Sequence, residues 1–192
     1  MLIVIDIHYL NVSEIMNRLI HQLYYDGKIT KEDIINMNIF YLDECPKKAA
    51  KLQYNKHVVK MILESAQMLC TAHHELLDDP DVPYKPAHVN HPSTIWTRSD
   101  NHHYHWLYDH MLALGDEYTK RYGKEHLSIT KCKEPLRLAP INIPHIEFKQ
   151  PPQCMPDKYK DKCSIQAYWN YYIGEKHTIA NPKTEKIYER RP

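Results

Sequence analysis

Glycine is scarce in this 192-residue sequence: only four are present, and none lies in a G-x-G-x-x-G or G-K-[ST] pattern. Without such a loop the chain has no phosphate cradle, which argues against a nucleotide-hydrolysing motor. Long apolar runs are also missing, so no membrane span is expected, and residues 1–7 are too short and poorly flanked for a signal peptide. A hydrophobic content of 43% with 26% charged residues is ordinary for a globular chain with a real core.

No two cysteines have the spacing of a known metal-binding or redox motif. The five cysteines are an odd number and include no C-x-x-C pair. This usage is typical of a reduced, intracellular chain and not of a disulfide-bonded scaffold.

Metal-binding motifs are equally missing, although histidine is abundant. Ten of the 14 histidines lie between His57 and His126, but no H-E-x-x-H or Cys/His ligand spacing appears. His105 and Asp109, four residues apart on an expected helix, could share one ion. The sequence therefore favours no metal and no other cofactor, and a His/carboxylate metalloenzyme stays open as an alternative.

Neither sign of charge is in excess overall, since the formal net charge is +1, but the charges are unevenly distributed. Residues 1–118 hold 10 Lys/Arg against 16 Asp/Glu, a net −6. Residues 119–192 hold 15 against 8, a net +7. A basic C-terminal third is compatible with a polyanion partner.

Apolar periodicity and capping residues predict mostly helices. Helices are expected at residues 12–25, 30–35, 47–53, 55–77, 100–122 and 164–173. Two short apolar runs, residues 2–7 and 38–42, read as strands that could pair. The proline-punctuated segments 78–97 and 131–156 lack periodicity and are expected to form a long loop and an extended surface segment.

The predicted fold class is therefore mainly α. We expect one compact helical domain, residues 37–192, with residues 1–36 packed on it as an N-terminal extension. At most a small two-stranded β element is expected near the N-terminus.

The expected helix that begins at Asn55 is apolar around most of its circumference. At about 100° per residue, its polar residues fall within an arc of roughly 80°. These residues, called the polar stripe below, are His57, Lys60, Glu64, Gln67 and Thr71. A helix so apolar should lie inside the domain. The polar stripe would then be either its only solvent-exposed edge or the wall of a cleft.

Two interpretations of the polar stripe remain open. A carboxylate beside a lysine and a histidine can serve as a general base or stabilise a developing cation, which makes Glu64, Lys60 and His57 the candidate catalytic residues. The alternative is a purely structural ion pair between Lys60 and Glu64, four residues apart, on a solvent-exposed edge of the helix. On the first interpretation the stripe should face a cleft shared with Trp96 and Arg98.

The segment 91–106 offers candidates for substrate binding. Its aromatic rings could stack on a base, its arginine could grip a phosphate, and its asparagine could read a base edge. Together with one residue of the stripe, the candidate substrate-binding residues are Gln67, His91, Trp96, Arg98, Asn101 and Tyr104. Alternatively, Tyr104 and Trp106 are core residues of a helix and Arg98 is an ordinary ion-pair partner.

The basic third of the chain contains an aromatic run at residues 167–176. Aromatic rings interleaved with lysines suit stacking on bases and contact with phosphates. The candidate DNA-binding residues are Lys158, Lys160, Lys162, Trp169, Tyr171 and Lys176. The alternative is a C-terminal helix whose aromatic residues, Tyr168 or Tyr172 above all, dock on the core.

Six short stretches look like those of a known group of proteins. They are residues 37–42, 56–61, 91–98, 117–124, 155–160 and 167–172. Together they resemble a set of uncharacterised phage and large-virus proteins over about Met37 to Lys176. This resemblance implies a virus-encoded protein in the cytoplasm of an infected host cell, and it implies no activity.

A second resemblance concerns the order of features along the chain. A short N-terminal segment, a helix with His and Glu seven apart, a long aromatic-rich helix and a C-terminal aromatic–basic run are similar to pyrimidine-dimer DNA glycosylases of the endonuclease V type. In that family a helical glutamate is the catalytic acid/base group, and the C-terminal run touches DNA. The resemblance implies a compact all-α domain with Glu64 as the catalytic glutamate, His57 as the helical histidine and residues 168–172 as the aromatic run.

The chain departs from that family at the nucleophile. The family attacks the sugar with the amine of a small N-terminal residue exposed after removal of Met, whereas this chain begins Met1-Leu2 and an alternative start reads Met37-Asn38. The arginines that flank the family's glutamate are also missing. A lysine, Lys60 or Lys56, would then form the Schiff base, with its neutral form favoured by burial on an apolar helix, or water would attack instead.

The leading hypothesis is a virus-encoded DNA-base-processing enzyme. It would be an N-glycosylase, with or without lyase activity, that acts on damaged or modified pyrimidines after flipping or unstacking them. DNA would be bound modestly and in a salt-sensitive manner, because the net charge is close to zero. The alternative is a non-catalytic nucleotide- or protein-binding phage module directed against host defence. No membrane partner is expected.

Overall fold

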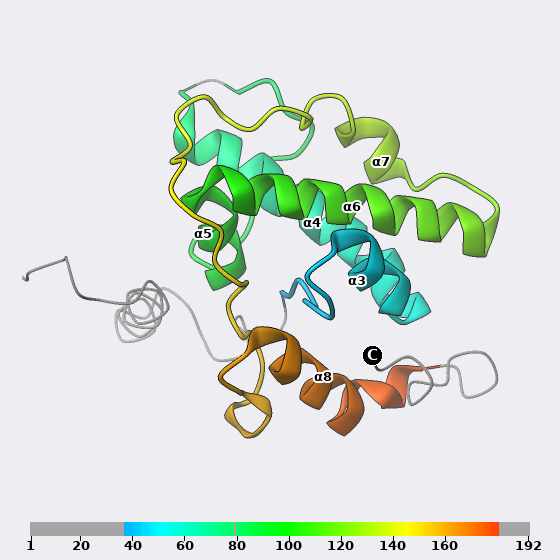
Figure 1. Ribbon diagram of the computed structural model, residues 1–192. Helices are drawn as coiled ribbons and strands as arrows, with labels where there is room; N and C mark the ends of the chain where they lie inside the picture. Colours follow the sequence, from blue (N-terminus) through cyan, green and yellow to red (C-terminus); the bar gives the residue numbers. More distant parts are fainter. Residues whose placement is uncertain (1–36, 79, 181–192) are drawn as a thin grey trace, which may run out of the picture.

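The computed structural model describes residues 37–78 and 80–180, and helices dominate this part of the chain (Figure 1). The α-helices are α3 (Pro46–Leu52), α4 (Asn55–Leu76), α5 (Pro92–Ser99), α6 (Asn101–Tyr122), α7 (Leu127–Cys132) and α8 (Ser164–Gly174). Two short 3-10 helices are η2 (Asp157–Tyr159) and η3 (Lys176–Ile179). The predicted mainly α fold is confirmed. The elements predicted before residue 37, and the packing of residues 1–36 as an extension, lie outside the described residues.

The start and end of α6 follow from capping residues that the sequence makes recognisable. The Oδ1 atom of Asp100 accepts the N–H of His102 at 2.8 Å and so caps the first turn. Gly123 ends the helix at φ 69°, in the left-handed region where a residue without Cβ is unstrained. Its N–H binds the Thr119 carbonyl at 2.8 Å. The prediction of a helix over residues 100–122 is confirmed.

The prediction of a loop over residues 78–97 is wrong in its last part, where α5 begins, and α7 was not predicted. Both helices start in the same way: the Nδ1 atom of a histidine accepts the backbone N–H of the serine two residues later. His91 binds Ser93 at 3.1 Å, and His126 binds Ser128 at 3.2 Å. Because Ser, Thr, Asp and Asn are the usual N-cap residues, neither histidine cap is recognisable from the sequence, although Pro92 at the first position of α5 is a start signal.

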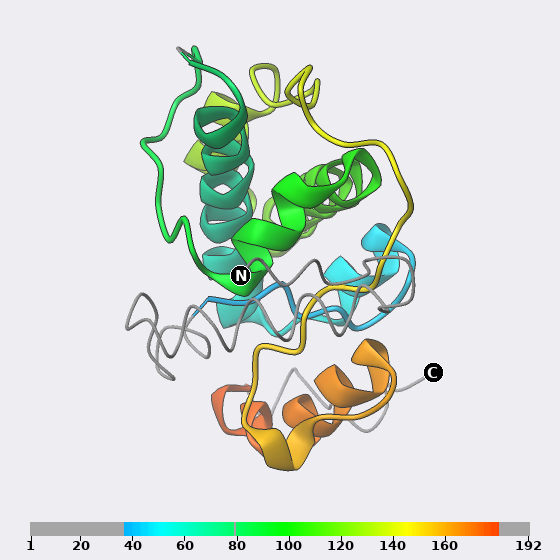
Figure 2. The same ribbon diagram turned by 90° about the vertical axis from the view of Figure 1, so that its left-hand side faces the viewer.

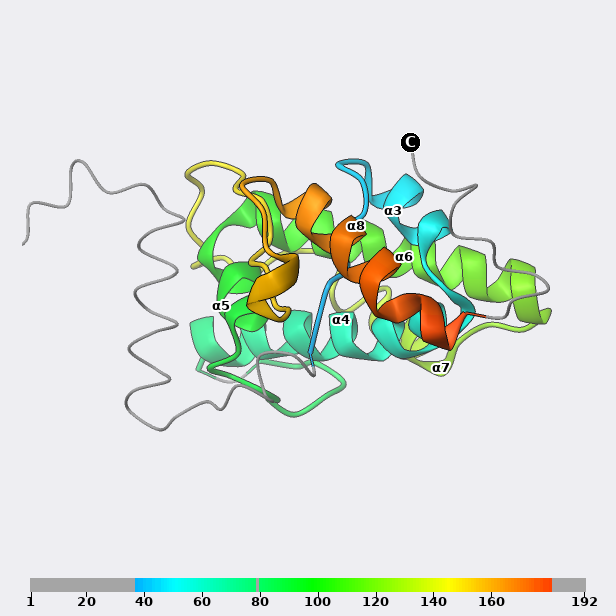
Figure 3. The same cartoon turned by 90° about the horizontal axis from the view of Figure 1, so that it is seen from below.

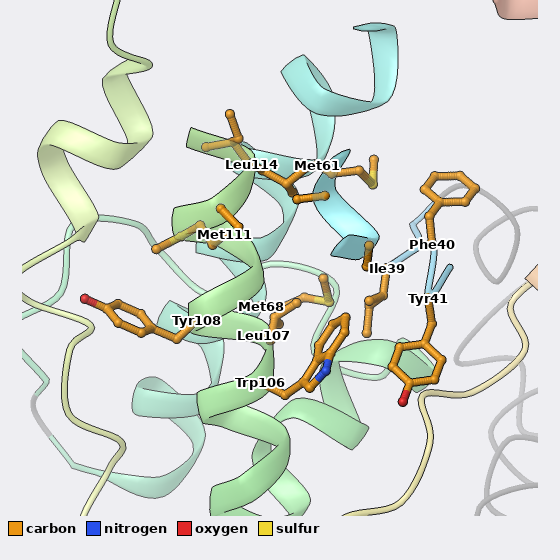
Figure 4. Close-up of a cluster of buried hydrophobic side chains, with 14 of the residues drawn as sticks. Ile39, Phe40, Tyr41, Met61, Met68, Trp106, Leu107, Tyr108, Met111 and Leu114 are labelled. Carbon is orange, nitrogen blue, oxygen red and sulfur yellow. The ribbon is translucent and has the colours of Figure 1, made fainter. Parts of the chain in front are cut away.

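Residues 37–42 run through the core between α8 and the other helices and are called the central segment below (Figure 2). Figure 2 shows α4, α5 and α6 on one side of it and α8 on the other. The side chains of Ile39 and Tyr41 point into the cluster of buried side chains beside α6, and the side chain of Phe40 turns the other way (Figure 4). There the ring of Phe40 stacks on that of His57 from α4, with centroids 4.0 Å apart. Phe40 meets the ring of Tyr172 from α8 edge-on, with ring centroids 5.3 Å apart. The central segment therefore joins α8 to the rest of the core.

The prediction of a strand at residues 38–42 is wrong, because no strand occurs in the part of the chain that the structure describes. Side chains take the place of a partner strand. Gln53 donates from Nε2 to the Ile39 carbonyl at 3.2 Å, and Trp169 donates from Nε1 to the Leu42 carbonyl at 3.0 Å. These contacts satisfy buried backbone groups that a sheet would otherwise satisfy.

The side chain of Asn38 makes further contacts with the backbone of the central segment. Its Oδ1 atom accepts the N–H groups of Ile39 at 3.0 Å and Phe40 at 3.3 Å. Its Nδ2 donates to the Cys154 carbonyl at 2.6 Å. Phe40 has a φ of 54°, a left-handed conformation that a side-chain turn of this kind supports and that interrupts an extended run.

Candidate functional site

The polar stripe of α4 is divided between different environments. Seen from below, α8 lies in front of α4, with the central segment between them (Figure 3). His57 is buried against α8, Lys60 is exposed, and Glu64 is buried against the central segment. Gln67 is half-buried, and Thr71 is buried under a loop. The five residues therefore do not line one continuous surface.

His57 is a packed, neutral histidine. Its ring stacks on Phe40 with centroids 4.0 Å apart, and its Nδ1 atom lies 2.5 Å from the Tyr172 hydroxyl. Burial, together with the charges of Lys176 and Lys60, lowers the pKa of His57 to about 3. At neutral pH the imidazole therefore carries no charge, and it holds α4, the central segment and α8 together.

Glu64 is the buried carboxylate of the stripe. The residue is 8% exposed, its Oε1 atom lies 2.9 Å from Lys60 Nζ, and its Oε2 atom accepts the N–H of Asn38 at 3.3 Å. Burial raises the pKa of Glu64, and the ion pair with Lys60, the N–H of Asn38 and the charge of His88 partly oppose this effect. A carboxylate that takes up a proton more readily than usual, held on a long helix, has the properties of a general base.

Lys60 keeps its ammonium group in water. Its side chain is 57% exposed, against 10% for that of Glu64. The expectation that burial favours the neutral amine is therefore wrong for Lys60, because the apolar sides of α4 are buried and this side is not. Lys56 is exposed as well. Neither lysine is predisposed by desolvation to form a Schiff base.

Two strained backbone positions are linked to Glu64, one through a neighbouring contact and one through a charge. Among the described residues, Phe40 and His88 are the non-glycine residues with positive φ, at 54° and 48°. Phe40 lies two residues after Asn38, whose N–H contacts Glu64, and the charge of His88 is the smallest of the influences that lower the pKa of Glu64. Such a conformation costs of order 1 kcal/mol, persists where the surroundings impose it, and is concentrated at functional sites. Glu64 is therefore the best-supported candidate site.

The loop that carries His88 is tied to both α4 and α5. The Oγ1 atom of Thr71 accepts the N–H of Ala87 at 3.0 Å and lies 3.2 Å from the Ala87 carbonyl. Arg98 donates from Nη1 to the Val89 carbonyl at 2.7 Å. These contacts fix the backbone on both sides of His88.

Arg98 binds the loop that carries His88 and lies far from Glu64. Its Nη2 atom is 3.9 Å from Glu75 Oε2. Glu75 follows Glu64 on α4 by three turns, which is roughly 16 Å along the helix axis. The expected cleft, in which Arg98 would share a wall with the whole polar stripe, is therefore not formed.

The other residues predicted to bind a substrate make structural contacts. Trp96 is 1% exposed and Tyr104 is fully buried, and each donates a hydrogen bond to a backbone carbonyl at 2.9 Å. His91 is the N-cap of α5. Asn101 is half-buried, with its Nδ2 atom 3.4 Å from His145 Nδ1. Trp96 and Tyr104 belong to the core and present no free ring face to a base.

The residues predicted to bind DNA fall into two groups. The lysines that precede α8 are exposed: Lys158, Lys160 and Lys162. Trp169 and Tyr171 are buried, 3% and 0% exposed, so the alternative of a helix whose aromatics dock on the core holds for them. Lys176 Nζ lies over the ring of Tyr171, 4.6 Å from its centroid. The exposed lysines can reach a phosphate, whereas the two aromatic rings cannot stack on a base.

Asn38 and His88 were not among the predicted site residues. Asparagine is a common turn residue, so the turn at Asn38 has a recognisable signal, but its contact with a residue 26 positions away does not. The positive φ of His88 is imposed by tertiary contacts and leaves no trace in the local sequence.

Within residues 37–78 and 80–180, no three His, Cys, Asp or Glu side chains are grouped so that they could hold a metal ion. No helix in the same residues is long and apolar enough to cross a membrane. No protein-family model, no curated protein and no solved structure matches the chain.

Proposed function

We propose that the chain is a virus-encoded DNA-base-processing enzyme, an N-glycosylase that releases a damaged or modified pyrimidine with Glu64 as the general base. The observation that carries this proposal is the buried carboxylate of Glu64, whose pKa is raised by burial while Lys60 keeps it paired at 2.9 Å. Environments that move a carboxyl pKa towards neutrality are typical of acid–base catalysts. The resemblance to pyrimidine-dimer glycosylases points to the same residue.

The reaction that fits these residues is hydrolysis. Glu64 in its ionised form takes a proton from a water molecule while the water oxygen forms a bond to the sugar C1′. The C1′–N1 bond to the pyrimidine breaks, and its electron pair leaves with the base. Water is favoured over an amine as the nucleophile because the ammonium group of Lys60 is exposed and ion-paired.

Lys60 has an electrostatic role in this scheme. Its positive charge stabilises the ionised form of Glu64, which a buried carboxyl would otherwise avoid. It also lies at the surface, where it can contact the phosphate backbone that flanks a flipped nucleotide.

Two further lysines influence groups that neighbour the polar stripe. The charge of Lys176 acts on His57, one helical turn before Lys60. The charge of Lys160 acts on Cys154, whose carbonyl binds Asn38 next to Glu64.

Base release from DNA duplexes that carry single damaged or modified pyrimidines tests the proposal. Free bases are separated and identified by mass spectrometry. Glu64→Gln should lower the rate by at least about 100-fold, because a general base contributes roughly that much or more. The matched control is Glu75→Gln, a substitution on the same helix at the Arg98 pair, which should retain the rate. Equal rates in the wild-type protein and Glu64→Gln would contradict the proposal.

A second candidate function is the non-catalytic binding module. The burial of Trp96, Tyr104, Trp169 and Tyr171 favours it, because these rings offer no surface to an unstacked base. A binding module would keep its affinity for its ligand in Glu64→Gln and would release no base, and this outcome separates the two functions.

A further inference from the structure

Tyr159 of η2 is a half-buried aromatic residue in the basic C-terminal third of the chain. Its ring packs against the ring of Tyr171 from α8, with centroids 5.2 Å apart and planes tilted by 38°. Its carbonyl accepts a hydrogen bond from Asn170 Nδ2 at 3.4 Å. Contacts to both the ring and the backbone of Tyr159 therefore hold it on α8.

Gly174, the last residue of α8, makes room for this ring. A Cβ atom added to Gly174 would lie 2.4 Å from Cε1 of Tyr159, closer than two carbon atoms can approach without bonding. A larger residue at this position would displace the ring. The seat of Tyr159 on α8 therefore depends on a residue without a side chain.

An exposed lysine lies over one face of the Tyr159 ring. Lys158 Nζ is 4.7 Å from the ring centroid, and the lysine is exposed. Ring and cation attract each other only weakly at such an exposed position, so the ammonium group can leave and open this face to solvent. Tyr171 differs, because it is 0% exposed although Lys176 Nζ lies 4.6 Å from its ring centroid.

We propose that Tyr159 stacks on an unpaired base of single-stranded DNA. The base takes the place of Lys158 Nζ on the ring, and the lysine moves to a phosphate that flanks this base. Lys160 and Lys162 are exposed close by in the chain and can contact further phosphates. An aromatic ring surrounded by cations is the arrangement that binds single strands with little preference for sequence. This binding requires no chemistry at Glu64.

The charges around Tyr159 make stacking important for the affinity. Asp157 Oδ1 lies 2.8 Å from Lys160 Nζ, and Glu175 Oε1 lies 3.5 Å from Lys176 Nζ. These carboxylates offset part of the positive charge that a phosphate would meet. The ring should therefore supply a large share of the binding free energy, and removal of the ring should be easy to detect.

Fluorescence anisotropy of a labelled oligothymidylate with the full chain tests the role of Tyr159. Tyr159→Ala should lower the affinity by roughly 10-fold or more, which is typical of the loss of one base–aromatic stack. Tyr159→Phe keeps the ring and should bind as the wild type does. The matched control is Tyr118→Ala, a half-buried tyrosine of α6 whose ring meets Tyr122 and His126, and it should leave the affinity unchanged.

Lys158→Gln provides a second test that leaves the seat of the ring intact, because it changes an exposed side chain. It removes one phosphate contact, so the slope of log affinity against log salt should fall by about 0.7, the value for one phosphate of a single strand. A slope equal to that of the wild type would contradict the movement of the lysine to a phosphate.

The outcomes separate this inference from the proposed function. Equal affinities of the wild type and Tyr159→Ala, or an equal loss in Tyr159→Phe, overturn stacking on Tyr159. Absence of single-strand binding by the wild-type protein overturns the inference even where base release is observed. Binding that depends on the Tyr159 ring, in a protein that releases no base, supports the inference and contradicts the proposed function.

Discussion

His57, His103 and His110 are buried, and burial lowers their pKa values to about 3, 4 and 4. An unfolded chain protonates the same side chains near pH 6.5. Because each folded pKa lies below the unfolded one, the folded state binds fewer protons at intermediate pH. The stability contributed by these residues is complete above pH 6.5 and is lost as the pH falls towards 4.

The free energy of unfolding should therefore fall steeply in mild acid. Each buried histidine contributes a slope of up to about 1.4 kcal/mol per pH unit. His57→Phe keeps a ring on Phe40 and removes one titrating group, so its slope between pH 6 and 4 should be shallower by about that amount. Urea unfolding at several pH values measures the slope. An unchanged slope would mean that His57 is not held neutral in the fold.

The left-handed backbone conformation of His88 should destabilise the fold. A glycine at this position adopts φ 48° without strain, so His88→Gly should raise the free energy of unfolding by roughly 0.5–1 kcal/mol. Gly123→Ala, at φ 69°, should lower it by a similar amount. Thermal unfolding of the two variants gives the comparison, and a lower melting temperature for His88→Gly would show that the side chain itself stabilises the loop.

The central segment has no regular secondary structure and is held in place by hydrogen bonds from side chains to its backbone. Asn38→Ala would remove the acceptor for two buried N–H groups and the donor to the Cys154 carbonyl. We expect the free energy of unfolding to fall by about 2–3 kcal/mol, the cost of leaving such groups unsatisfied. Asn142→Ala, which removes a single exposed hydrogen bond to the Leu76 carbonyl, should cost less than about 1 kcal/mol. Chemical unfolding measures both, and equal effects would contradict the role given to Asn38.

The sequence predicts elements whose boundaries are set locally and misses those set by distant contacts. Asp100 and Gly123 mark the ends of α6 because a carboxylate cap and a left-handed glycine act within one turn. His91 is an unusual cap for α5, and Pro92, at its first position, is equally typical of a turn, so the sequence indicates a loop where that helix lies. The central segment looks like a strand because its residues are apolar, but its partners are side chains from α8 and from Gln53, just after α3.

The same division applies to the candidate site. The helical period alone places Lys60 and Glu64 within reach of each other, so this pair could be predicted. Periodicity cannot tell that α8 covers His57 or that Trp96 faces the core. These facts depend on how separate elements pack.

For the whole molecule, the distribution of charge should govern any contact with DNA. Replacing Lys158, Lys160 and Lys162 by Gln should weaken binding and reduce the slope of log affinity against log salt, by about 0.9 for each duplex phosphate that is no longer neutralised. Replacing Lys47 and Lys48, exposed lysines of α3, should change the slope little. Fluorescence anisotropy with labelled DNA over a range of salt measures this slope. Affinity that does not depend on salt would contradict a nucleic-acid partner.

The pH dependence of base release by the wild-type protein and by Lys60→Met tests most directly whether Glu64 is the general base. Release should fall in acid as Glu64 becomes protonated, and Lys60→Met should move this fall to higher pH, because the ion pair that lowers the pKa of Glu64 has been removed. Base release whose acid limb stays at the same pH in Lys60→Met, or no base release at any pH, would contradict the assignment of Glu64 as the general base.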